Sequence, residues 1–467
     1  MILAGMKLEE LESLMAEMNA TKFRAKQIHN WIYSKSVSTI DEMTNLSKDF
    51  REELKKVATV TDTKIKVKQV SKDGTIKYLV EYPDGECVET VLMRFDNRAN
   101  LTACVSSQVG CAVNCSFCAT GKGGFKRNLT YKEIIEQVLT IQRDTGLKVT
   151  NIVFMGQGEP LLNLDNVLKA LEIFNDDFQI GARRITISTS GIIPGISRLA
   201  DLSLQSTLAI SLHAPTHDLR KEIMPIENRY PLPELKKALL NYVEKTGRRI
   251  TIEYILIHKF NDTQPVAKEL AYFLKDLKCN VNLIPYNSVI ENDYKKPSNG
   301  DIMKFKYLLE HSGKKVTVRL ERGADIDAAC GQLRGKEKIM HNTKTSIILL
   351  ILFLSGIAVF ANNDRLPGSS IADNRLQADT LSTVYTASAM VKSNCNKFQV
   401  INTELKTMPK YNKIYKGQRF ASSTWIEEWT VDACGQKLVV PIAFIPDKKG
   451  FGTSFSITPK YIYELSK

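Results

Sequence analysis

The sequence lacks several features that would place it in other protein classes. Residues 1–5 lead straight into an acidic, helix-like stretch, so the chain does not open on the apolar run of a secretory signal. Cysteines are few and unevenly spread, with seven of the nine lying before residue 331. In an enzyme-sized region, tight clustering of cysteines indicates a metal-binding or catalytic group rather than a disulfide framework. We therefore expect this region to work in the cytoplasm.

Length and positive charge are what the chain does have. Its 467 residues, 43% of them hydrophobic, are enough for about two to four domains with full cores. Lys and Arg number 64 against 51 Asp and Glu, which gives a net charge of +13. This charge favours a polyanionic partner, most simply nucleic acid. The alternative is a soluble protein that is basic without such a partner.

Residues 1–60 are predicted to form a small helical module. Apolar residues recur at helical spacing in three successive stretches, one of them over residues 22–33. The second stretch carries Lys22, Arg24 and Lys26, which are candidates to grip RNA. The alternative for these three residues is a solvated charged face.

Residues 61–96 change character and predict a β-meander. Apolar and polar residues alternate here, and Asp73-Gly74 and Asp84-Gly85 are typical of hairpin turns. We expect three antiparallel strands that connect the helical module to the main domain.

Residues 97–338 repeat a pattern of strand, loop and helix. This alternation predicts an α/β domain built on a parallel sheet, either open or closed into a barrel. Functional residues are expected on the loops that follow the carboxyl ends of its strands. The candidate strands are residues 101–105, 151–154, 184–188, 207–212, 250–256, 281–284 and 316–320.

Residues 340–361 have the anatomy of a secretory signal peptide placed in mid-chain. The run 346–361 holds no charge and is nearly all apolar, Lys344 precedes it, and Val359 and Ala361 are the small residues expected before a cleavage site. The run is slightly short for a membrane-spanning helix, which needs about 20 residues. An export signal is favoured over a membrane anchor or a buried core helix.

Residues 362–467 are predicted to form a small, β-rich domain that is exported, and no motif indicates its function. Strands are expected over 425–434, 437–445 and 453–458, and its two cysteines, Cys395 and Cys434, are able to pair in an oxidising compartment. One hypothesis is that two genes have been read as one, with Met340 the true start of the second. The other is a genuine fusion tethered to the membrane, with the basic residues before the apolar run holding the enzyme inside.

Cys111, Cys115 and Cys118 form the strongest chemical signal in the chain. Three thiolates on one short loop can hold three irons of a 4Fe–4S cluster and leave the fourth iron open. Zinc is the alternative occupant, but structural zinc sites have four protein ligands, and no fourth Cys or His follows at zinc-finger spacing. The spacing of the three cysteines, with Phe117 before the last, resembles the radical S-adenosylmethionine superfamily.

Seven further motifs surround this loop in a fixed order. They are CVSSQVG at 104–110, ATG at 119–121, GQGEPLLN at 156–163, STSG at 188–191, SLHAP at 211–215, NLIPYN at 282–287 and DAACGQL at 327–333. Together they resemble the dual-specificity RNA methyltransferase family, from the N-terminal helices to about Lys338. The resemblance implies a radical S-adenosylmethionine partial (β/α) barrel over residues 97–338, preceded by an RNA-binding helical module and the meander.

The resemblance also implies the residues of the cofactor site. Cys111, Cys115 and Cys118 would bind the cluster, and the amino group of S-adenosylmethionine would meet Gly158 and Glu159. The rest of its site would be lined by Ser188, Ser211, Leu212, His213 and Asn287. Taken alone, a Gly-Glu pair is usually a turn, and a Ser-Leu-His sequence is usually a strand end with a core histidine. One departure is Gln157, where the family usually has Met, and it puts little in doubt because Gly158 and Glu159 are intact.

The implied chemistry needs a radical because a methyl sulfonium and the adenine carbon between two nitrogens are both electrophiles. In the family's route, one of two S-adenosylmethionine molecules methylates Cys330, and the second yields a deoxyadenosyl radical that takes hydrogen from that methyl. The carbon radical adds to the ring, and Glu89 removes the ring proton. Cys104 then attacks the sulfur of Cys330 and frees the methylated base. Taken alone, Cys104 and Cys330 are typical of small buried residues.

The implied substrates are an adenosine in the peptidyl-transferase region of 23S ribosomal RNA and one beside the tRNA anticodon. The implied partner is an electron donor such as flavodoxin or ferredoxin, and a membrane is a partner only if the apolar run is a real anchor. Within the family, the alternative is methylation at carbon 8, and the sequences at 160–163, 213–215 and 253–254 favour carbon 2. An alternative of another class is a non-catalytic iron–sulfur or zinc RNA-binding module, which would need neither Cys330 nor the cofactor-lining residues.

Overall fold

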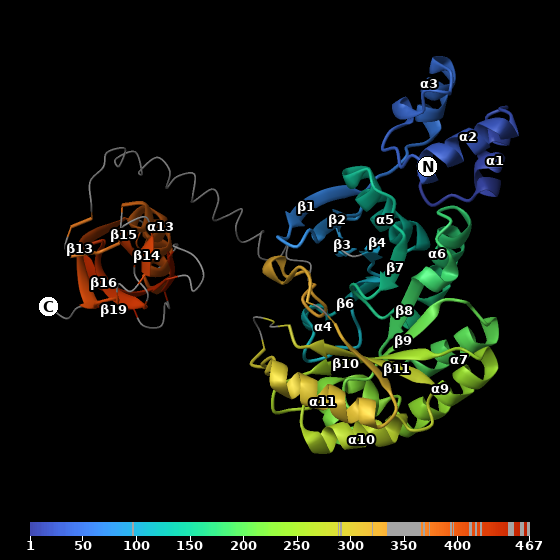
Figure 1. Cartoon of the computed structure of the whole chain (residues 1–467). Helices are drawn as coiled ribbons and strands as arrows, with labels where there is room; N and C mark the ends of the chain where they lie inside the picture. Colours follow the sequence, from blue (N-terminus) through green and yellow to red (C-terminus); the bar gives the residue numbers. More distant parts are fainter. Residues whose placement is uncertain are drawn as a thin grey trace. The chain divides into compact units, whose positions relative to one another are not determined.

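The chain divides into two units of different size, Met1–Lys338 and Ile339–Lys467 (Figure 1). The computed structural model describes residues 1–95, 98–287, 289, 292–319 and 321–333 of the first unit, and residues 366–367, 369–372, 374–392, 395, 397–410, 413–415, 418–420, 423–446, 453–457 and 462–464 of the second. The signal-like run at 346–361 lies outside these residues. Within them, no helix combines the length and the apolar character needed to cross a bilayer.

The N-terminal helices pack through one apolar side each. They are α1 (Leu8–Glu17), α2 (Lys22–Tyr33) and α3 (Lys48–Val57), which confirms the three predicted stretches. Helix α2 has the predicted bounds and buries Ala25, Ile28 and Ile32, which share one side because they recur at helical spacing. Ser47 begins α3 by accepting a hydrogen bond from the Phe50 amide.

One sheet runs through the rest of the first unit, in the order β1-β2-β3-β4-β7-β8-β9-β10-β11-β12. Strands β1 to β4 are antiparallel, whereas β4 and all later strands of this sheet run parallel. The predicted three-stranded meander is therefore extended by β4 and is continuous with the barrel sheet. Because β12 and β1 are the two ends of the order, the barrel is partial. The strands are β1 (Lys64–Val70), β2 (Ile76–Glu81), β3 (Cys87–Phe95), β4 (Arg98–Cys104), β7 (Asn151–Phe154), β8 (Ile185–Thr189), β9 (Thr207–Ser211), β10 (Ile250–Leu256), β11 (Cys279–Pro285) and β12 (Lys315–Val318).

Helices connect the parallel strands and lie on the outer face of the sheet (Figure 1). Helix α5 shows how their ends are encoded: Thr130 and Glu133 form a capping box at its start, and Gly146 ends it in the left-handed conformation. A short hairpin, β5 (Gln108–Gly110) with β6 (Phe125–Asn128), frames the predicted cluster loop. The helices are α4 (Ala119–Lys122), α5 (Tyr131–Thr145), α6 (Leu164–Asp176), α7 (Ile193–Leu202), α8 (His217–Ile223), α9 (Leu232–Thr246), α10 (Gln264–Leu274) and α11 (Asn299–His311).

The second unit packs helix α13 (Asn374–Val391) with an antiparallel sheet. The sheet confirms the three predicted strands as β16 (Trp425–Ala433), β17 (Gln436–Pro446) and β18 (Thr453–Ile457). The sequence did not predict α13, β13 (Phe398–Thr407), the short pair β14 (Lys413–Tyr415) and β15 (Gln418–Phe420), or β19 (Tyr463–Glu464). Cys395 and Cys434 form a disulfide, with Cα atoms 5.8 Å apart.

Candidate active site

A cavity of about 160 Å³ opens at the carboxyl ends of the parallel strands. Nine of the thirteen residues singled out in the sequence line it: Cys111, Cys115, Cys118, Gly158, Glu159, Ser188, Ser211, His213 and Cys330. They come from separate motifs and meet here because adjacent parallel strands end at the same edge of a sheet. The other four, Glu89, Cys104, Leu212 and Asn287, lie outside its lining.

The three cysteines of the cluster loop are held by a tight backbone. The Cys111 amide donates to the carbonyl of Gly124 (2.8 Å), and the Cys118 amide donates to that of Cys115 (3.2 Å). Gly121 lets the chain pack closely here, because a Cβ at this position would lie 3.0 Å from the Cys115 backbone nitrogen, a tight contact. Burial raises the pKa of the Cys111 thiol to about 12 and that of Cys115 well above its usual value. Thiols in this setting ionise when a metal binds them.

Cys111, Cys115 and Cys118 line one cavity together. A structural zinc site takes four protein ligands, whereas three thiolates hold three irons of a 4Fe–4S cluster. Three thiols spread around one cavity wall fit the three protein-bound irons of a 4Fe–4S cluster.

Glu159 is fixed at the cavity wall by protein donors. Its carboxylate accepts hydrogen bonds from the amide and hydroxyl of Ser190, both at 2.7 Å, and from the Leu161 amide at 3.0 Å. Burial raises the pKa of Glu159, and these hydrogen bonds oppose the shift. Gly158 has φ +102°, and a Cβ there would lie 2.6 Å from that of Gln108, so only glycine fits. The loop geometry therefore explains both residues of this motif.

His213 presents a neutral imidazole to the cavity. Its Nδ1 accepts a hydrogen bond from the Ile255 amide (3.0 Å), and burial together with Arg220 lowers its pKa to about 3. Ser188 and Ser211 face each other with their hydroxyl oxygens 3.3 Å apart. The Leu212 side chain is fully buried in the core, so this residue can offer a ligand only its backbone.

Cys104 and Cys330 are neighbours, although only Cys330 lines the cavity. Burial and, to a smaller extent, the charge of Cys330 raise the pKa of the Cys104 thiol to about 12, and Arg319 opposes both effects. Arg319 is half-buried in the cavity wall, and the charge of Cys330 raises its pKa. The Asn287 amide donates to the Cys330 carbonyl at 3.2 Å. A permanent cation therefore stands beside the two predicted reactive sulfurs.

Three cationic side chains, Lys77, Arg220 and Arg319, are the functional candidates that the sequence did not reveal. Glu89 lies on β3 and forms a buried ion pair with Lys77, at 3.1 Å. Arg220 forms another with Glu227, at 2.6 Å, and also donates to the carbonyl of Ser190. Lys77, Arg220 and Arg319 belong to no sequence motif, and only the tertiary structure shows that the first two are buried and that Arg319 lines the cavity.

Comparison with known proteins assigns the family. Residues 1–60 match the model of the ribosomal RNA large subunit methyltransferase N-terminal domain, and residues 105–269 match the radical SAM superfamily. Probable dual-specificity RNA methyltransferases RlmN from Alkaliphilus oremlandii and Staphylococcus aureus are each 50% identical over 72% of this chain, and over 97% and 93% of their own lengths. The chain belongs to the RlmN family of dual-specificity RNA methyltransferases. A radical SAM methyltransferase from Sphaerobacter thermophilus has the same fold as the first unit, with a TM-score of 0.68 and 44% identity over 72% of this chain and 99% of that one.

Membership of the RlmN family makes the first unit a radical SAM RNA methyltransferase. The superfamily implies S-adenosylmethionine and a 4Fe–4S cluster as its cofactors, and the cysteine-lined cavity has the donors to hold the cluster.

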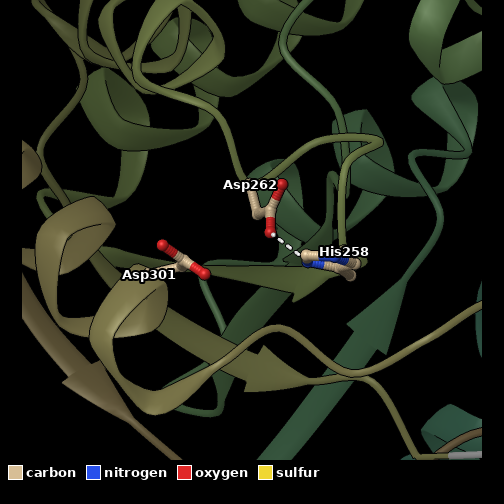
Figure 2. A group of neighbouring side chains, drawn as sticks. All are labelled: His258, Asp262 and Asp301. Atoms are coloured by element: carbon tan, nitrogen blue, oxygen red, sulfur yellow. Dashed lines mark ion pairs between the residues drawn. The ribbon is translucent and has the colours of Figure 1, made fainter.

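A second group of potential metal ligands lies apart from this cavity, at His258, Asp262 and Asp301 (Figure 2). Asp262 accepts a hydrogen bond from the Lys259 amide (2.9 Å) and lies 3.6 Å from the His258 ring. Asp301 accepts one from the hydroxyl of Ser298 (2.6 Å), the residue that caps α11. Since both carboxylates already bind protein donors, we assign no cofactor to this group.

Proposed function

We propose that the first unit methylates carbon 2 of an adenosine in the peptidyl-transferase region of 23S ribosomal RNA, and of an adenosine beside the tRNA anticodon. The proposal rests chiefly on one observation. Cys330 shares a cavity with the three cluster cysteines, and Cys104 is its neighbour. A non-catalytic RNA-binding module would not need this pair of thiols beside a cofactor cavity.

The cofactor residues follow from the cavity. Cys111, Cys115 and Cys118 hold the cluster in this proposal. S-adenosylmethionine binds against Gly158, Glu159, Ser188, Ser211 and His213, which line the cavity, and against the backbone of Leu212. Asn287 lies beside the cavity, where its side chain is hydrogen-bonded to the Cys330 carbonyl, and completes the site. Two molecules are used in each turnover, one after the other. When bound, the cluster and S-adenosylmethionine supply the methyl group and the carbon radical chemistry.

Three side chains of the protein then complete the methylation. Cys330 carries the methyl group, and its carbon becomes bonded to the adenine ring. Glu89 takes the ring proton as a general base. Cys104 attacks the sulfur of Cys330, which leaves a disulfide between the two cysteines and frees the base. The freed methylene carbon takes a proton from solvent to become the methyl group, the ring proton goes to Glu89, and the one electron lost would return to the iron–sulfur centre that the three cysteines would hold. An external donor such as flavodoxin or ferredoxin supplies electrons for the next turnover.

The direct test is the identity of the product. RNA treated with the reconstituted enzyme should contain 2-methyladenosine when its nucleosides are separated by mass spectrometry against standards of both isomers. Finding only 8-methyladenosine would move the chain to the other specificity of the family. The same assay with 23S ribosomal RNA and with tRNA as separate substrates tests the two targets.

The two units have opposite redox requirements. The first keeps seven free thiols, three of them for the cluster, whereas the second holds the Cys395–Cys434 disulfide. Disulfides persist in oxidising compartments, and cluster thiols need a reducing one. We propose that the first unit works in the cytoplasm and residues 362–467 in an oxidising compartment. Mass spectrometry of the native protein separates the two routes to this arrangement, since one polypeptide spanning residues 338–362 would contradict two gene products and leave the membrane-tethered fusion.

A further inference from the structure

Lys77 is buried against Glu89, the proposed general base. Lys77 lies on β2 opposite Val91, and Glu89 is two residues before Val91 on β3, so both side chains are on the same face of the sheet. The ammonium nitrogen is 3.1 Å from the Glu89 carboxylate, and the two side chains are only 3% and 4% exposed. A buried charge that loses its partner is strongly unfavourable, so each member of the pair depends on the other.

The same ammonium also reaches the loop that carries Cys330. It donates a hydrogen bond to the carbonyl of Asp327, three residues before Cys330, at 3.1 Å. Asp327 adopts the left-handed conformation, with φ +50°, which sharply turns the chain there. A single nitrogen on β2 therefore touches both the carboxylate of Glu89 and the backbone that places Cys330.

The hairpin between β1 and β2 holds the other side of this loop. The Gly323 amide donates to the Asp73 carboxylate at 3.0 Å, and the hydroxyl of Ser71 donates to Asp325 at 2.5 Å. A side chain at Gly323 would meet Thr75 at 2.9 Å. The meander is thus joined to the Cys330 loop at its turn as well as at Lys77.

We propose that Lys77 is a positioning residue that holds the Glu89 carboxylate within reach of the adenine ring attached to Cys330. The inference rests on the proposed function, because it assigns Glu89 the ring proton. An ammonium has three N–H donors, and two of them here fix the two partners relative to each other. A general base has to lie within hydrogen-bonding reach of the proton that it takes. Without Lys77, the earlier steps at Cys330 remain possible, and the proton step fails.

The test compares Lys77→Met with the parent enzyme on RNA. Methylation of Cys330 and formation of 5′-deoxyadenosine should stay within about twofold of the parent, while released methylated RNA falls by about 100-fold, the lower end of what a positioned general base contributes. RNA should accumulate covalently attached to the protein. Lys77→Arg should restore part of the release, because it keeps the cation. Lys66→Met is the matched control: Lys66 pairs with Glu81 on the neighbouring strand, half-exposed, and its loss should change nothing.

Three outcomes would overturn the inference. They are normal release by Lys77→Met, equal loss of every step, and failure of Lys77→Arg to release more RNA than Lys77→Met. If Lys77→Met does not fold, the double variant Lys77→Met with Glu89→Gln removes both buried charges and should match Glu89→Gln alone in every step. A further loss in the double variant contradicts a role through Glu89. A parent enzyme that methylates no RNA refutes the proposed function instead.

Discussion

Removal of the Cys104 thiol should trap the enzyme on its RNA. Once the methyl carbon joins the adenine ring to the sulfur of Cys330, protein and RNA are one covalent molecule. Cys104 is the thiol beside that sulfur, buried under Val91, Met93 and Leu333, where bulk thiols have poor access. The variant Cys104→Ala should therefore purify with RNA attached, in denaturant and in high salt, whereas electrostatic binding is lost in high salt.

The pKa of Cys104 sets how fast release should be in the parent enzyme. Burial raises this pKa to about 12, so the attacking thiolate is the minor form at neutral pH and gains population as the pH rises. Below the pKa its fraction grows about tenfold per pH unit, so it rises about 100-fold between pH 7 and pH 9. Release from the covalent intermediate should accelerate about 100-fold over that interval.

Rapid quenching of a single turnover measures this directly. The ratio of attached to released RNA would be followed at pH 7, 8 and 9, and the 5′-deoxyadenosine formed in the same sample would report how far the preceding radical step has gone. Cys104→Ala should keep its RNA at every pH, and adding Cys330→Ala should prevent the attachment. An intermediate of equal lifetime at pH 7 and pH 9, or RNA-free Cys104→Ala from cells with active cofactor, refutes the reasoning.

Four further predictions concern the cluster cysteines, two arginines and the disulfide. Replacing the three cluster cysteines by Ala should remove iron, sulfide and the brown colour; a colourless, zinc-loaded parent after anaerobic reconstitution contradicts the cluster. Arg319→Met should raise the pKa of Cys104 and slow release at pH 8, measured by the same quench. Arg220→Met should lower the free energy of unfolding by about 3–5 kcal/mol, because it leaves Glu227 buried without its cation, and adding Glu227→Leu should recover most of it in denaturant titrations. Cys395→Ser removes the disulfide that closes a loop of 39 residues and should lower the free energy of unfolding of the second unit by about 2–4 kcal/mol. Under oxidising conditions the variant should melt at a lower temperature than the parent.

The cofactor cavity could largely be anticipated from the sequence. Glu159, Ser188 and Ser211 belong to three separate motifs, and each follows or ends a predicted strand. Parallel strands bring such residues to one edge, so their meeting in one cavity required only the correct fold class. Helix α2 has the predicted bounds because its apolar residues recur at helical spacing on one side.

Partners that depend on strand register could not be anticipated. Lys77 occupies a polar position in an alternating strand, and nothing local shows that it lies opposite Val91 and beside Glu89. Helix α13 was also missed, since its Ser, Thr and Ala residues leave only a weak apolar stripe, and its packing against the β13–β18 sheet stabilises it. In both cases the deciding interactions join segments far apart in the chain.

The most direct test of the account uses S-adenosylmethionine with a trideuterated methyl group. If the methyl carbon passes through Cys330 and loses one hydrogen to the radical, the 2-methyladenosine formed should carry two deuteriums and one solvent-derived hydrogen. The third deuterium should appear in 5′-deoxyadenosine. Mass spectrometry of both nucleosides reads the two labels in one sample. A product that keeps all three deuteriums would mean direct methyl transfer and would contradict the roles of Cys330, Cys104 and Glu89 together.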